Sequence, residues 1–93
     1  MLESFKCKET LKIWNLHFSK KLPKEIQSAA RRKLVAISIA NTIQDLRNPP
    51  SNYLEKLKGS RKGQYSVRIN NQWRICFEWK KNSAYNIEIV DYH

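Results

Sequence analysis

Residues 57–79, LKGSRKGQYSVRINNQWRICFEW, decide the fold of this chain. Apolar and polar side chains alternate here in two runs, whose apolar members are Tyr65, Val67 and Ile69, then Trp73, Ile75, Phe77 and Trp79. Such alternation is typical of half-buried β-strands. Side chains directly opposite each other in an antiparallel pair point to the same side, so the two apolar sets share a face only if Ile69 pairs with Trp73. The sequence therefore predicts a hairpin whose loop, residues 70–72, contains asparagines that tolerate a left-handed backbone.

This register places two arginines opposite each other. Arg68 falls across from Arg74 on the polar side of the predicted hairpin. Like charges so placed repel at a cost on the order of 0.2–1 kcal/mol. The pair is explained if a phosphate normally lies between the guanidinium groups, and the alternative is that Glu78 or Glu88 neutralises them. We expect both side chains on an open face of the sheet, so that Arg74→Ala leaves the fold intact.

The two glycines of the chain lie at the start of this stretch. Gly59 and Gly63 bracket three residues, and glycine gives the backbone the freedom that a tight loop needs. We expect this loop to hold Lys58, Arg61 and Lys62 beside the hairpin.

Length and charge bound the class of protein. The chain has 93 residues, which suits one domain, residues 1–93, with a modest core. Eighteen Lys and Arg against eight Asp and Glu leave a formal charge of +10. Such a charge attracts polyanions and indicates contact with nucleic acid, although solvation or an acidic protein partner remains an alternative.

Several classes of protein are not expected. No apolar run approaches the roughly 20 residues of a membrane span, and the residues after Met1 lack the apolar core of a signal peptide, which indicates a cytoplasmic protein. Cys7 and Cys76 have no metal-type spacing and are predicted to be reduced, structural thiols. A glycine-rich phosphate loop, a Ser-His-Asp set and a metal-ligand cluster are all missing from the sequence. We therefore expect neither a cofactor nor a metal mechanism.

Two helices are predicted before the hairpin. Leu11, Trp14 and Phe18 recur at helical spacing within residues 8–18. A second helix is expected to begin with Pro23 as its first residue and to end near residue 40. Its apolar stripe is Ile26, Ala30, Leu34 and Ile37. Residues 31–33, Arg-Arg-Lys, are interpreted as its solvated face rather than a binding site.

The remaining chain completes the predicted architecture. A short turn at residues 43–46 precedes Asn48-Pro49-Pro50, which stops helical structure. Residues 85–90 are rich in β-forming side chains, and residues 2–6 are a weaker candidate strand. Helices followed by a meander of strands predict an α+β fold, with two helices on one face of a twisted, mainly antiparallel sheet of four to five strands.

The last residues supply acid–base groups. Asp91, Tyr92 and His93 carry a carboxylate, a phenol and an imidazole, whereas His17 is interpreted as a packing or surface residue. Cations with a few ionisable side chains suit the cleavage of RNA by its own 2′-hydroxyl. In that reaction a base takes the 2′-proton, cations stabilise the phosphorane and an acid protonates the departing 5′-oxygen. DNA lacks the 2′-hydroxyl and would be inert.

These motifs together resemble one known family. The segments LKGSRKG at 57–63, NNQWRI at 70–75 and DYH at 91–93 are similar to those of HigB-type toxins in the RelE/ParE toxin superfamily, some of them called plasmid-maintenance killer proteins. The resemblance covers essentially the whole chain. It implies a ribosome-dependent mRNA endonuclease that acts in the ribosomal decoding site and is neutralised by a helix-turn-helix antitoxin of the HigA type.

The resemblance also implies roles for residues. Lys58, Arg68 and Arg74 become phosphate or transition-state cations, and Asp91, Tyr92 and His93 become the remaining active-site groups. The residues implied to contact RNA are Lys56, Arg61 and Lys62. Some family members carry His-Pro where Glu55-Lys56 stands here, and Glu55 can replace that histidine only as a base or an orienting group.

Two other functions fit the same scaffold. One is a non-catalytic, ParE-like inhibitor of DNA gyrase, whose sequence sign would be the loss of the acid–base cluster at residues 91–93. The other is a basic RNA-binding module without turnover. An acidic antitoxin segment laid over the cationic face would suit any toxin built in this way.

Overall fold

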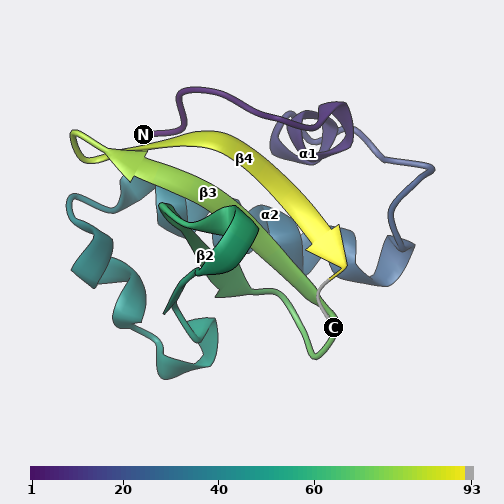
Figure 1. Cartoon of the computed structure of the whole chain (residues 1–93). Coiled ribbons are helices and arrows are strands. Elements are labelled where there is room, and N and C mark those ends of the chain that lie inside the picture. The colour runs from purple at the N-terminus through teal and green to yellow at the C-terminus, as the bar shows by residue number, and fades with distance from the viewer. Residues whose placement is uncertain (92–93) are drawn as a thin grey trace.

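A four-stranded antiparallel sheet forms the centre of the computed structural model, which describes residues 1–91. The strands lie in the order β1 (Glu55–Lys56), β2 (Gln64–Arg68), β3 (Trp73–Lys80) and β4 (Ser83–Asp91). Figure 1 shows the long, curved β3–β4 pair with α2 behind it. The α+β prediction is confirmed.

The hairpin register is the predicted one. Val67 lies across from Ile75, and Arg68 lies across from Arg74. The backbone N–H of Ile69 donates to the Trp73 carbonyl at 2.9 Å. The Asn70 side-chain oxygen accepts the N–H groups of residues 72 and 73, each at 2.8 Å, and so closes the loop.

Helix α2 (Lys24–Ile39) matches its prediction closely. All four residues of the apolar stripe are buried, and Pro23 caps the helix rather than serving as its first residue. The stripe packs on the face of the sheet that carries Val67, Ile75 and Ile87. Burial of these side chains stabilises the fold by roughly 25 cal/mol for each Å² of apolar surface removed from water.

Helix α1 (Lys8–Trp14) is shorter than expected and buries a different face. It ends before Leu16, whose backbone is left-handed with φ 63°. Leu11 and Phe18 are exposed, and the buried residues are Thr10 and Ile13. Thr10 faces inward because its hydroxyl accepts the backbone N–H of Ile89 on β4 at 3.0 Å. The predicted stripe was therefore wrong apart from the partly buried Trp14.

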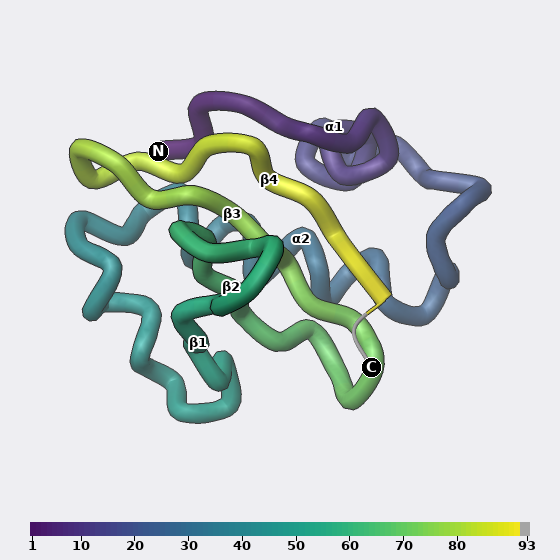
Figure 2. The backbone as a smooth tube through the Cα atoms, viewed as in Figure 1, coloured from purple at the N-terminus to yellow at the C-terminus, as the bar shows by residue number. Residues whose placement is uncertain are grey.

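The weak strand at residues 2–6 is reduced to two isolated bridges. Leu2 pairs with Ala84 and Phe5 with Ile87, both in parallel with β4. In Figure 2 this purple N-terminal segment runs along the edge of β4. The remaining bounds are those of three short 3-10 helices: η1 (Ile43–Arg47), at the predicted turn, η2 (Pro50–Asn52) and η3 (Gly59–Arg61).

The second face of the sheet is covered rather than open. Ser66 and Cys76, on the face away from α2, are fully buried. In Figure 1 the short helix η3 lies in front of the sheet, and its Arg61 reaches Glu88 on β4. Leu57, between β1 and η3, is buried. The expectation of a half-open face was wrong because the chain that follows the edge strand β1 folds back over β2 and β3.

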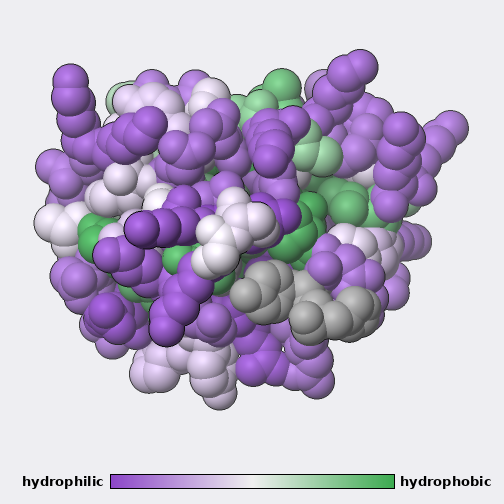
Figure 3. All heavy atoms as spheres, in the orientation of Figure 1, coloured by the Kyte–Doolittle hydropathy of each residue, from purple (hydrophilic) through white to green (hydrophobic). Residues whose placement is uncertain are grey.

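Polar side chains dominate the surface seen in Figure 3, including the region over η3. None of the helices within residues 1–91 is both long and apolar enough to cross a membrane.

Candidate active site

Arg74 is the most heavily contacted of the predicted site residues. Its Nε donates to the Ser66 hydroxyl at 2.8 Å, and Nη2 donates to the Tyr53 carbonyl. Nη1 lies 3.2 Å from a Glu55 carboxylate oxygen. Only 7% of Arg74 is exposed. The guanidinium therefore joins β1, β2 and the 53–54 segment, and its predicted place on an open face was wrong.

Arg68 lies across from Arg74 in the ladder, and its hydrogen bonds go to the hairpin loop. It is half-buried, and its Nε donates to the Asn70 carbonyl at 3.0 Å, while Nη2 contacts the Asn71 side chain. Its Cζ lies 4.9 Å from the centre of the Tyr53 ring. The two arginines share Tyr53 as a neighbour, and the Glu55 carboxylate beside Arg74 offsets part of the repulsion expected between them.

Glu78 and Glu88 were the carboxylates considered as neutralising Arg68 and Arg74, and their described ion pairs are with other residues. Glu88 lies 3.0 Å from Arg61 and 3.6 Å from Lys6. Glu78 pairs with Lys80, and a hydrogen bond from the Asn86 amide is the main cause that lowers the pKa of Glu78. Glu55, which was predicted only as a base or orienting group, is the carboxylate beside Arg74.

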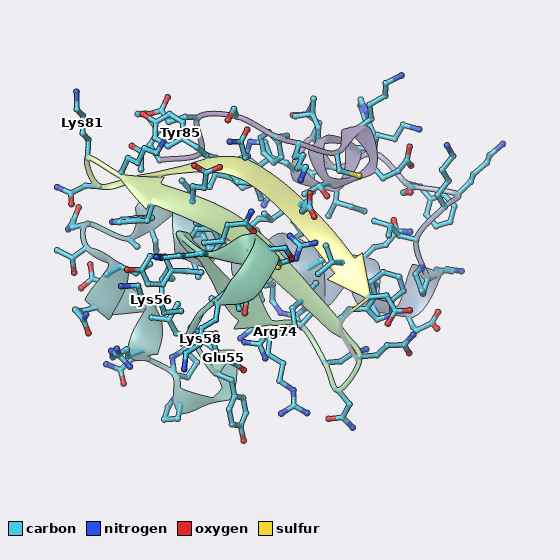
Figure 4. All side chains as sticks on the ribbon, in the orientation of Figure 1. Glu55, Lys56, Lys58, Arg74, Lys81 and Tyr85 are labelled. Carbon is cyan, nitrogen blue, oxygen red and sulfur yellow. The ribbon has the colours of Figure 1, made fainter. Side chains whose placement is uncertain are left out.

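Three of the predicted cations are exposed around one hollow. Lys56, Lys58 and Lys62 line a cavity of about 340 Å³ together with Leu57 and Gly59. Figure 4 shows Lys56, Lys58, Glu55 and Arg74 in the same region, whereas Lys81 lies at the far end of the β3–β4 hairpin. The left-handed backbone of Gly59, φ 66°, lets the chain turn into η3 directly after Lys58.

Arg61 differs from these lysines. Besides its ion pair with Glu88, its Nη1 donates to the Gln64 side chain at 3.1 Å. These contacts hold η3 against the sheet above the buried Cys76. The predicted contact of Arg61 with RNA stays a prediction, and it requires an arginine that is already engaged within the fold.

Asp91 lies at the end of β4, in register with Trp73. Ladder partners point to the same side, so Asp91 shares the side of Trp73, whereas Arg74 faces the opposite side. The Gln72 amide donates to the Asp91 carboxylate at 3.0 Å. The predicted roles of Tyr92 and His93 fall outside the residues that the structure describes.

The sequence reasoning missed two residues that hold the arginines. Ser66 is fully buried and accepts from Arg74, and Tyr53 contacts both Arg74 and Arg68. The sequence did carry a signal for Ser66. In the predicted register it lies across from Cys76 and on the same face as Arg68 and Arg74, where a small hydroxyl can serve as a buried hydrogen-bond partner. Tyr53 carried no such signal because the 47–57 segment has no periodicity.

The basic tripeptide of α2 is only partly a solvated face. Arg31 stacks on Trp14 at 4.5 Å and donates to its carbonyl, and Lys33 donates to the Asn52 side chain at 2.6 Å. Arg32 is exposed, as is His17.

The thiols match their prediction. Both cysteines are free, and burial is the main cause that raises the pKa of the Cys76 thiol. Within residues 1–91, no three His, Cys, Asp or Glu side chains gather in a way that could hold a metal ion.

Comparison with known proteins identifies the family of the chain. Residues 3–93 match the family model described as the RelE-like toxin of type II toxin-antitoxin system HigB. Toxin HigB-1 of Vibrio cholerae is 42% identical over 65 residues, which cover 70% of this chain and 68% of that protein. Endoribonuclease HigB of Proteus vulgaris is 31% identical over the full length of both chains.

A solved structure shares the fold. The crystal structure of the heterotetrameric YoeB-YefM toxin-antitoxin complex from Staphylococcus aureus contains a chain with a TM-score of 0.62 and 20% identity, covering all of this chain and 98% of that one. The fold and the family model together define the class, that of RelE-like toxins of type II toxin-antitoxin systems. The chain belongs to the HigB-like toxin family, and its partner in such a system is an antitoxin.

Proposed function

We propose that this HigB-like toxin is an endoribonuclease that cuts mRNA in the ribosomal decoding site. The observation that carries the proposal is the grouping of Glu55, Lys58 and Arg74 at one edge of the sheet, with Lys56 and Lys62 around the adjoining hollow. The full-length relative in Proteus vulgaris is named an endoribonuclease, which supports the same activity here.

The chemistry would be an internal transfer at phosphorus. The 2′-oxygen attacks the adjacent phosphorus as it loses its proton to a base, and the bond from phosphorus to the 5′-oxygen breaks. The departing oxygen takes a proton from an acid, so the products are a 2′,3′-cyclic phosphate and a 5′-hydroxyl end. Cations near the phosphorus stabilise the charge that builds up in the transition state.

Individual residues suit parts of this reaction. Glu55 is the carboxylate that pairs with Arg74, and its exposed side chain suits a base. Lys58 is exposed and suits direct contact with the phosphate, while Arg74 holds Glu55 in place at 3.2 Å. Tyr92 and His93 are proposed to supply the acid, and Asp91, which faces the opposite side of the sheet from Arg74, is proposed as a supporting group.

Arg68 and three further residues are proposed to bind the strand. Lys56 and Lys62 line the hollow beside Lys58, Arg61 lies in η3 and Arg68 is the last residue of β2. Their positive charges suit backbone phosphates. The proposed antitoxin is of the HigA type, with a helix-turn-helix domain, and an acidic segment of it would compete with RNA for the same lysines.

The test is 5′-end mapping of transcripts after brief induction of the toxin. New 5′-hydroxyl ends within translated mRNA are expected from the wild type. Lys58→Gln should reduce their yield by a factor of about 100 to 1,000, the range that loss of one charge-stabilising group costs. Lys81→Asn removes one charge at the far end of the sheet and keeps the left-handed backbone there, φ 49°, so it should cut like the wild type.

Two outcomes would overturn the proposal. Growth arrest without new 5′-hydroxyl ends would indicate a binding module rather than a nuclease. If Lys58→Gln produced new ends at the wild-type rate, the residues at this edge of the sheet would take no part in the reaction.

A further inference from the structure

Tyr53 occupies an unusual place beside the two arginines. Its carbonyl accepts a hydrogen bond from Arg74, and its ring lies under the guanidinium of Arg68. Tyr53 as a whole is nevertheless 56% exposed. It is therefore held at its backbone while much of the residue faces solvent.

The backbone of Tyr53 is left-handed, with φ 43° and ψ 53°. Bulky side chains rarely adopt this region, and such conformations persist where the surrounding structure imposes them. Here the neighbouring residue supplies that constraint. Asn52 is 1% exposed, and its amide donates to the carbonyls of Leu46 and Asn48, each at 3.1 Å. Its oxygen accepts from Lys33 of α2 at 2.6 Å.

These contacts aim the ring into a cleft. Tyr53 and Arg68 line a cavity of about 590 Å³ between the 49–53 segment and α2, and Arg32 and Lys33 lie on its α2 side. None of the described residues that line this cleft is acidic. An exposed aromatic ring within a set of cations is the combination with which proteins bind single-stranded nucleic acid, the ring stacking a base and the cations contacting phosphates.

We propose that Tyr53 stacks a base of the RNA strand, in the nucleotide next to the phosphate that is cut. This inference rests on the proposed ribonuclease function and extends it by one subsite. The base lies against the part of the ring that Arg68 leaves uncovered, and Arg68 and Arg32 contact the flanking phosphates. The subsite adjoins the reaction centre because the same residue, through its carbonyl, holds Arg74.

The test compares one substitution that removes the aromatic ring with one that keeps it. Tyr53→Asn removes the ring and tolerates the left-handed backbone, and Tyr53→Phe keeps the ring without the hydroxyl. Base stacking on an aromatic side chain corresponds to a change of roughly 5- to 150-fold in affinity. We expect Tyr53→Asn to lower kcat/KM on mRNA-programmed ribosomes within this range and Tyr53→Phe to stay within about twofold of the wild type. Phe18→Ser, at an exposed ring on another surface, is the matched control.

A second measurement separates stacking from a general loss of structure. An abasic nucleotide is moved through the positions beside the cleavage site in the mRNA. At one position the abasic nucleotide should lower the kcat/KM of the wild type by as much as Tyr53→Asn lowers it on intact RNA. Tyr53→Asn and the abasic nucleotide together should lower kcat/KM no further than either alone. Additive losses at every position would overturn the inference, as would wild-type kinetics in Tyr53→Asn.

The outcome remains distinct from that of the proposed function. If the wild type fails to cut RNA, the cycle of Tyr53→Asn and the abasic substitution is repeated as a binding measurement. The Kd is then determined for a short single-stranded RNA with a 2′-deoxy group at each position. Equal affinities of the wild type and Tyr53→Asn would overturn the inference. If Tyr53→Asn weakens only the binding of the antitoxin, the cleft takes an acidic protein segment, and the RNA subsite is rejected.

Discussion

At the scale of single residues, a buried arginine links the strands of the site. Arg74 contacts Glu55 on β1, Ser66 on β2 and the carbonyl of Tyr53. Arginine suits this position better than lysine because its planar group carries five N–H donors in a fixed arrangement. Its positive charge still lies beside Glu55, so one side chain both holds the fold together and sets the electrostatics of the site.

Arg74→Ala is therefore expected to destabilise the protein as well as inactivate it. The substitution leaves the buried Ser66 hydroxyl and the Tyr53 carbonyl without this donor, and each such loss costs about 1–3 kcal/mol. Chemical denaturation should show a free energy of unfolding lower by about 2–6 kcal/mol, the sum of these two losses. Arg74→Lys should recover part of it. Lys62→Ala, at an exposed position, should remain within about 0.5 kcal/mol of the wild type, and equal stability of Arg74→Ala would contradict the contacts described.

At the scale of elements, short irregular segments carry the site. The chain from η1 to η3 contains little regular structure, yet it holds Tyr53, Glu55 and Lys58. η1 begins this segment with a capping box between Thr42 and Asp45. The Asp45 carboxylate accepts the N–H groups of Asn41 and Thr42 at 2.9 and 3.1 Å.

This capping box predicts a contribution to acid sensitivity. The hydrogen bond from the Thr42 backbone is the main cause that lowers the pKa of Asp45 from its ordinary 3.8. A lowered folded-state pKa contributes stability that is present above pH 3.8 and is lost as the pH falls through the folded value. Asp45→Asn cannot titrate, so unfolding free energies measured from pH 5 to pH 2 should decline less steeply for this variant. Parallel curves for the two proteins would show that the box is not formed.

At the scale of the whole molecule, part of the positive charge is paired within the fold and part of it is exposed. The formal charge is +10, and part of it neutralises carboxylates within the fold, as Arg61 does with Glu88. Exposed lysines such as Lys56, Lys58 and Lys62 remain available to a polyanion. Their attraction to RNA depends on salt because binding releases counterions from the strand.

Salt dependence should identify the lysines that contact RNA. The slope of log Kd for single-stranded RNA against log salt is expected to fall by about 0.7 when one phosphate contact is lost. Lys58→Gln should show this decrease, and Lys81→Asn should leave the slope unchanged. An equal decrease in both variants would mean that the protein attracts RNA through its total charge rather than at this edge.

The three longer strands, the hairpin register and α2 could be predicted because they depend on local patterns, whereas the two-residue strand β1 was not predicted. Alternation with a period of two determines which side chains share a face, and the stripe from Ile26 to Ile37 determines which side of α2 is buried. Family membership was also predicted from the motifs around Gly59, Trp73 and Asp91. Candidate residues such as Lys58 and Glu55 followed from those motifs, and their roles stay predictions.

Only the tertiary structure decided which polar residues became buried. Arg74 and Thr10 lie inward because their partners, the carboxylate of Glu55 and the backbone N–H of Ile89, come from distant parts of the chain. Periodicity records the polarity of a side chain but not the partner that compensates its burial. A polar group can leave water at little cost once such a partner is supplied, and that supply depends on how residues 53–63 fold back over the sheet.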